Sequence, residues 1–194
     1  MTHKTSFDSE ASDVSDVEEE IIETKAQSSD QNFQDISLIK VISKILTSVI
    51  EEKKKLPNYK KVIKSQTKMV FSSNNIPKIS IEDYLTRIQK YTKVEKSTLI
   101  ISLIYIDRIC AKKLTLTYFN VHRIIFSAIL ISIKYNEDIY YKNKYYAEIA
   151  GVNIKELEIL EHSFVDLLEF KLFVADHTYE KYRTYLDDYE SGDK

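Results

Sequence analysis

The sequence predicts an all-α fold, and three observations favour helices over strands. The 194-residue chain holds only two glycines and two prolines, whereas strands joined by tight turns need many of both. Apolar residues recur at the helical period of about 3.6 along segment 36–54. The uncharged runs 97–106 and 124–133 lie in helix-compatible stretches of about 15 residues, much longer than a usual strand of about 5–6.

Start and stop signals divide the chain into successive helices. Capping-box patterns, in which a small polar residue precedes an acidic residue by three positions, begin at Ser80, Thr92 and Asn153. A further start lies near residues 117–120, and Gly151 can adopt the left-handed conformation that ends a helix. These signals predict helices at about 81–91, 94–111, 120–136, 143–150 and 154–169. The second and third are apolar on nearly every side, so we expect them in the middle of a bundle.

The N-terminal segment differs in composition from the rest of the chain. Residues 1–35 contain ten acidic and two basic residues, a charge of −8, which leaves +6 on the remainder of a chain whose net charge is −2. So polar a segment buries too little apolar surface to offset its ordering entropy, and we expect a disordered acidic tail. Ser9, Ser12 and Ser15 lie among acids in a pattern that acid-directed kinases favour. A purely solubilising tail is the alternative.

Several classes of site are absent from the sequence. Two glycines cannot build a glycine-rich phosphate loop, and Cys110 is the only cysteine, which excludes an intrachain disulfide and a cysteine-rich zinc site. The uncharged runs reach half the length of about 20 residues that a membrane span needs. We therefore expect an intracellular protein with no cofactor and no metal, since the four histidines show no ligand-like spacing: His3, His122, His162 and His177.

Lysines gather between the first helix and the second. They occupy positions 53–55, 60, 61, 64 and 68. Clustered lysines can bind nucleic acid, but such runs more commonly form a solvated face. Both interpretations stay open from the sequence alone.

Five short motifs in order give the chain a family resemblance. They are "ISIEDYLTRIQKYT", "YIDR", "NVHRIIFSAILISIKYNED", "YYAEIAGVN" and "ELEILEHSFVDLLEFKLFV". The order resembles the cyclin box, most closely that of single-box cyclins of the fungal phosphate-signalling type and the plant U-type. The resemblance implies one five-helix box at 77–175, preceded by an N-terminal helix and basic linker at 36–76 and followed by a short C-terminal helix and tail at 176–194.

The resemblance also implies an architectural ion pair. Asp107 of "YIDR" is expected to pair with an arginine of the preceding helix, for which Arg87 in "YLTRIQK" is the candidate. A bidentate pair of this kind pins two helices together. The Met-Arg-Ala-Ile-Leu stretch that docks substrates in cell-cycle cyclins is "LTRIQK" here, so docking of that type is not expected.

The functional residues carried over from the family are Lys134 in "IKYNED" and Glu161 in "LEHSF". In cyclins the matching residues lie on one edge and contact the kinase near its movable C-helix. Alone, Lys134 could serve the helix macrodipole and Glu161 could be an ordinary surface charge. Apolar or flanking contributions to the same edge are expected from Tyr135, His162, Phe170 and Leu172.

The sequence thus predicts a regulatory cyclin that forms a heterodimer with a cyclin-dependent kinase and activates it by stabilising the active position of the C-helix. The protein itself is expected to catalyse nothing, because no nucleophile with a neighbouring base stands out. The alternative is a cyclin-fold adaptor of transcription that contacts nucleic acid through its basic body. Binding of lysines to phosphates weakens steeply with salt, so the salt dependence of binding distinguishes the nucleic-acid adaptor from the kinase regulator.

Overall fold

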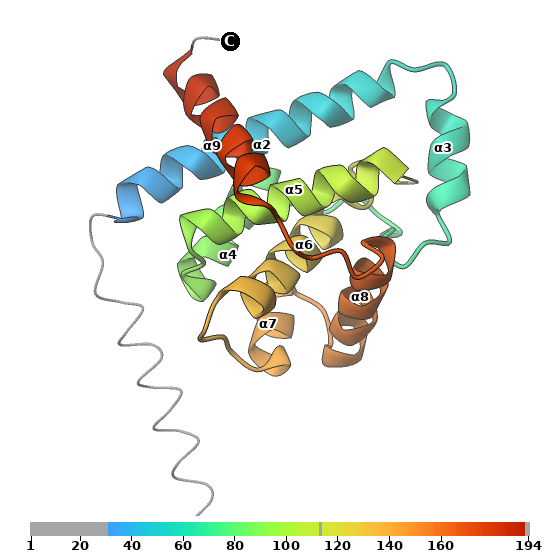
Figure 1. Cartoon of the computed structure of the whole chain (residues 1–194). Helices are drawn as coiled ribbons and strands as arrows, with labels where there is room; N and C mark the ends of the chain where they lie inside the picture. The colour runs from blue at the N-terminus through green and yellow to red at the C-terminus, as the bar shows by residue number, and fades with distance from the viewer. Residues whose placement is uncertain (1–30, 113, 193–194) are drawn as a thin grey trace, which may run out of the picture.

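The computed structural model describes residues 31–112 and 114–192, and the regular secondary structure in this part of the chain is entirely helical (Figure 1). The all-α prediction is confirmed. The serines predicted to be phosphorylated, Ser9, Ser12 and Ser15, lie outside the described residues. The helices, in chain order, are α2 (Gln31–Lys54), α3 (Tyr59–Gln66), α4 (Ile81–Thr92), α5 (Lys96–Lys112), α6 (Val121–Asn136), α7 (Asn143–Ala150), α8 (Ile154–Leu167) and α9 (Asp176–Ser191).

Helix α6 forms the centre of the bundle (Figure 1). It packs most extensively against α5, and α4, α7 and α8 cover its remaining sides. Helix α2 crosses the far side of α4 and α5, where it also meets α9. Since α6 is apolar on every face, this central position buries it from Val121 to Ile133 with only Arg123 half-exposed.

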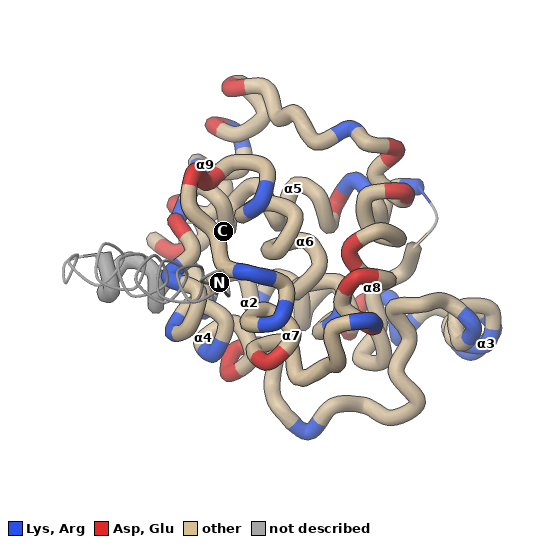
Figure 2. Tube along the Cα trace, turned by 90° about the horizontal axis from the view of Figure 1, so that it is seen from below, with Lys and Arg blue, Asp and Glu red and all other residues tan. Residues whose placement is uncertain are grey.

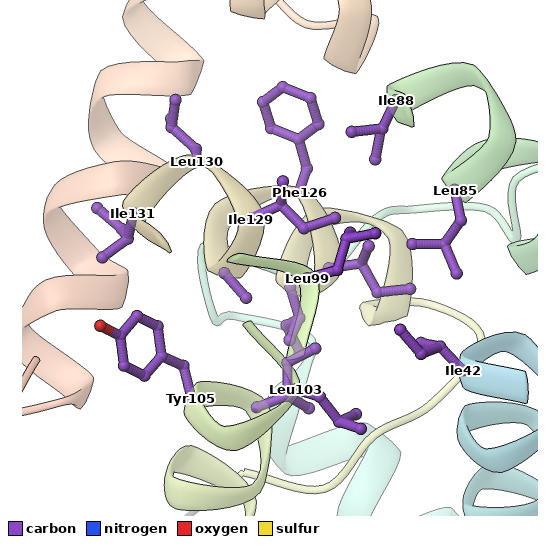
Figure 3. Close-up of a cluster of buried hydrophobic side chains, with 14 of the residues drawn as sticks. Ile42, Leu85, Ile88, Leu99, Leu103, Tyr105, Phe126, Ile129, Leu130 and Ile131 are labelled. Atoms are coloured by element: carbon purple, nitrogen blue, oxygen red, sulfur yellow. The ribbon is translucent and has the colours of Figure 1, made fainter. Parts of the chain in front are cut away.

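The core between these helices is built mainly from branched aliphatic side chains, with several aromatic rings among them (Figure 3). Leu99 and Leu103 of α5 belong to the same buried cluster as Phe126 and Ile129 of α6, and each is at most 4% exposed. Side chains from the outer helices close this core, including Ile42 of α2 and Leu85 and Ile88 of α4. One continuous core therefore fixes the relative positions of the helices that carry the candidate site.

Most of the helix boundaries follow from the predicted signals. The Ser80 hydroxyl accepts the Asp83 N–H at 3.0 Å, and Asn153 accepts the Glu156 N–H at 2.9 Å. Gly151 ends α7 with φ of 75°, where a residue with Cβ would be strained.

The capping box predicted at Thr92 is wrong. Thr92 is the last residue of α4, and its hydroxyl donates to the Ile88 carbonyl at 2.9 Å. The N–H of Glu95, just before α5, instead donates to the Glu137 carboxylate at 3.1 Å. A buried acid from beyond α6 thus caps α5, which no local sequence pattern indicates.

Helix α3 was not predicted, since the sequence indicated only a basic linker there. Its eight residues bury only Gln66. A helix with so little buried surface leaves no apolar stripe for sequence analysis to detect. The seven lysines of the basic region are all exposed, and Figure 2 shows several of them along α3.

None of the helices within residues 31–112 and 114–192 is both long enough and apolar enough to cross a membrane.

Candidate functional site

Three helices meet at a polar triangle formed by Lys134, Asn143 and Glu161. The Lys134 ammonium donates to the Asn143 side-chain oxygen and to the Glu161 carboxylate, both at 2.6 Å. The Asn143 amide donates to the other Glu161 oxygen at 3.1 Å. Each residue comes from a different helix, α6, α7 or α8, so the triangle links three elements at one rim of the bundle.

The triangle is only partly accessible to solvent. The Lys134 and Glu161 side chains are 24% and 20% exposed. Lys134 lies in the last turn of α6, where the helix dipole favours a cation. Partial burial and three mutual hydrogen bonds hold these charges in one arrangement, ready to contact another molecule without reordering. Asn143 was missed from the sequence, because an asparagine at the start of a helix resembles an ordinary cap.

A second ion pair connects the same two helices, α6 and α8, away from the triangle. Arg123 binds the Glu156 carboxylate and also donates to the Ser72 carbonyl at 2.9 Å. Its side chain and that of Glu156 are 28% and 32% exposed. This pair therefore resembles Lys134–Glu161 in burial and in the helices joined, and it provides a natural comparison.

Aromatic side chains project into solvent near the triangle and from the segment after α8. Tyr135, which follows Lys134, is 50% exposed, and Phe170 is 70% exposed. Leu172 is half-buried and packs against the core. Phe173 is 73% exposed and was not predicted, although the phenylalanine three residues earlier could have drawn attention to it. Two phenylalanines within four residues whose side chains are mostly exposed to solvent are typical of an interaction surface.

His162 stands outside the triangle. Its side chain is 82% exposed and lies 3.8 Å from Asp166, one turn further along α8. The structure therefore places this predicted residue on the same helix as Glu161, with its ring nitrogen near Asp166 and its side chain mostly in solvent.

The predicted ion pair between Arg87 and Asp107 is wrong. Arg87 donates to the Glu148 carbonyl at 3.0 Å, whereas Asp107 accepts the Tyr182 hydroxyl at 2.5 Å. The helices explain the difference, because α4 packs against α2, α6 and α7, while the end of α5 faces α9. Both side chains are exposed, so neither charge needs the other to offset burial.

Two observations bear on metal binding and on thiol chemistry in the part of the chain that the structure covers. No group of three or more His, Cys, Asp or Glu side chains there is arranged to hold a metal ion. Burial raises the pKa of the Cys110 thiol to about 12, with the nearby Asp107 carboxylate acting in the same direction. The thiol is therefore protonated near neutral pH and is a poor nucleophile.

Comparison with known proteins adds the family. The cyclin family profile matches residues 8–172, most of the chain. The chain belongs to the cyclin family. This cyclin is 34% identical to cyclin-U2-1 of Arabidopsis thaliana over 165 residues, which cover 80% of the chain and 72% of that relative.

Two further relatives represent the plant and fungal branches that the sequence resembles. Cyclin-U4-1 of Arabidopsis thaliana is 36% identical over 63% of this cyclin and 61% of its own length. PHO85 cyclin-7 of Saccharomyces cerevisiae is 30% identical over 80% of this cyclin and 61% of its own length. This cyclin thus spans about three fifths of the length of these two relatives, and the predicted resemblance is confirmed.

Proposed function

We propose that this cyclin is a non-catalytic regulatory subunit that binds and activates a cyclin-dependent protein kinase. The supporting observation is that Lys134 and Glu161, distant in sequence, form one preorganised polar triangle with Asn143 beside exposed aromatic residues. The names of PHO85 cyclin-7 and PHO85 cyclin-like protein psl1 connect those relatives to PHO85. PHO85 is therefore the first kinase to test.

The polar and apolar parts of this surface have different tasks. Lys134 and Glu161 offer a cation and an anion in fixed positions, which set the orientation of the partner and cost affinity when they are removed or mismatched. Tyr135 and Phe170 are exposed aromatic side chains of the kind that carry most of the energy at an interface. Tyr135 follows Lys134 at the end of α6, and Phe170 lies just after α8, the helix that carries Glu161.

Activation follows as a shift in the conformational population of the kinase. The cyclin binds the arrangement in which the kinase C-helix is turned inward better than the arrangement in which it is turned outward. The inward position completes the Lys–Glu pair that positions ATP. A nearly complete switch requires a differential binding free energy of about 5.5 kcal/mol.

The test compares the two ion pairs between α6 and α8. In one variant Lys134 and Glu161 both become alanine, and in the matched control Arg123 and Glu156 both become alanine. Binding to purified PHO85 and phosphorylation of a histone substrate are measured for each. We expect the first variant to lose binding and activation and the control to retain both. Equal behaviour of the two variants contradicts the proposal.

The exposed lysines on and next to α2 and α3 favour a second candidate, a nucleic-acid adaptor. All seven remain uncovered in the structure. Duplex DNA binding between 50 and 200 mM salt tests this candidate, because several lysine–phosphate contacts predict a loss of affinity of about a hundredfold or more. An unmeasurable affinity at the lower salt concentration rejects it.

A further inference from the structure

The chain after α8 is held against α5 by its backbone. We define residues 169–175 as the strap. Arg108 donates to the Lys171 carbonyl at 2.7 Å and to the Phe173 carbonyl at 3.0 Å, and Tyr105 donates to the Leu172 carbonyl at 2.7 Å. Three consecutive carbonyls are thus bound by two side chains of one helix. Backbone contacts of this kind fix the path of the strap whatever its side chains are.

The residues that hold the strap lie on one face of α5. Tyr105, Arg108 and Lys112 are three and four positions apart, the spacing that aligns side chains on a helix. The Arg108 guanidinium carbon lies 5.7 Å from the centre of the Tyr105 ring. Lys112 binds the Glu169 carboxylate at 2.7 Å, which ties down the first strap residue.

The strap begins in an unusual backbone conformation. Glu169 and Phe170 have φ of 54° and 58°, in the left-handed region that residues other than glycine seldom adopt. Two such residues in succession persist only where surrounding contacts hold them. The Phe170 N–H donates to the Val165 carbonyl at 3.1 Å, and the contacts from α5 hold the chain immediately afterwards.

This path leaves Phe170 and Phe173 outside while Leu172 packs inward. The two phenylalanines are 70% and 73% exposed. Exposing so much apolar surface to water does not stabilise the cyclin on its own. The strap is also continuous with the candidate site, because the Tyr105 hydroxyl neighbours Asn136, which follows Tyr135 in α6.

We propose that Arg108 is a positioning residue for kinase binding, and that Phe173 is a further anchor beside Phe170. Arg108 touches no partner itself. It holds the strap in the one path that turns both phenylalanines toward the kinase. This inference rests on the proposed function and adds to it the strap as the element that carries the apolar contacts.

A double-mutant cycle separates positioning from general stability. The variants are Arg108→Ala, the pair Phe170→Ala with Phe173→Ala, and all three changes together, each assayed for affinity to PHO85. Arg108→Ala is expected to weaken binding by about tenfold or more, the loss typical of an anchor. The same change is expected to have little further effect once both phenylalanines are gone, because Arg108 acts through them.

Two further measurements complete the test. Arg183→Ala is the matched control, since Arg183 is an exposed arginine paired within α9, and it is expected to leave affinity unchanged. Limited chymotrypsin cleavage at Phe170 and Phe173, without kinase, is expected to accelerate in Arg108→Ala and not in the control. Arg108→Lys, which keeps the charge but cannot bind two carbonyls in a fixed fork, is expected to fall between.

The outcomes are distinguishable. A wild-type cyclin that binds no kinase overturns the proposed function and this inference with it. A wild type that binds, with Arg108→Ala binding equally well, overturns this inference alone. An unchanged rate of strap cleavage in Arg108→Ala also overturns it. So does an equally large loss of affinity when Arg108→Ala is added to the variant that already lacks both phenylalanines, because Arg108 then acts by another route.

Discussion

Removing the Lys134 ammonium tests how strongly the triangle holds α6, α7 and α8 together. Lys134→Ala deletes two charged hydrogen bonds, each 2.6 Å long, and leaves the Glu161 carboxylate one-fifth exposed with only the Asn143 amide as a donor. Exposed ion pairs contribute less than about 1 kcal/mol, and breaking a fully buried pair costs about 3–5 kcal/mol. Intermediate burial places the expected loss at about 2 kcal/mol for Lys134→Ala and for Glu161→Ala.

The two single variants are expected to be coupled. Once one charge is gone, removing the other no longer breaks the pair, so the double variant is expected to lose about 2.5 kcal/mol rather than the additive 4. Urea unfolding at constant m-value measures these free energies, and each single variant is expected to lower Tm by about 4–8 °C. Losses that add to within about 0.5 kcal/mol refute a cooperative triangle.

Three other predictions follow from contacts elsewhere in the structure. Arg87 and Asp107 bind different partners, so the double alanine variant should lose unfolding free energy equal to the sum of the two single losses, to within about 0.5 kcal/mol in urea. A larger coupling between the two positions would show that they interact as an ion pair after all. Lys112 and Lys171 hold the pKa of Glu169 at about 2, below its ordinary 4.5, so strap stability should be full above pH 4.5 and fall toward pH 2. The rate of pepsin cleavage in the strap should rise as the pH falls from 4.5 toward 2 in the wild type but not in Glu169→Gln. If the two proteins show the same dependence on pH, Glu169 is not the group responsible. Burial lowers the pKa of His122 below 6.5, so its protonation favours the unfolded chain and stability should decrease as the pH falls below 6.5. Urea unfolding of His122→Gln should show a weaker dependence on pH there, and an unchanged dependence excludes His122 as the cause.

The fold was accessible from sequence because its signals are local. The cap at Ser80 and the left-handed Gly151 fix helix ends by contacts within a few residues, and both occur as predicted. The long apolar runs required a central position for α5 and α6. Helix α3 was missed because it buries one residue, and the cap of α5 was misassigned because Glu137 reaches it from across the bundle.

The candidate site was only partly accessible because its geometry is not local. The family resemblance selected Lys134 and Glu161, and the structure brings them together, but nothing in the sequence indicated Asn143 between them. The same resemblance paired Arg87 with Asp107, whereas α5 in this cyclin directs Tyr105, Asp107 and Arg108 toward the strap and α9. Side-chain partners across helices depend on helix rotation, which periodicity does not specify to a single residue.

Exchanging the two charges tests the central claim most directly. Lys134→Glu with Glu161→Lys keeps an ion pair between α6 and α8, and the Asn143 amide can turn to serve the reversed pair because it offers both a donor and an acceptor. If the triangle orients a kinase, the exchanged cyclin should lose only about 1 kcal/mol of stability, from an acid replacing the cation in the last turn of α6, yet fail to bind PHO85. If it binds PHO85 with wild-type affinity, the pair only holds helices together and the account of the surface is wrong.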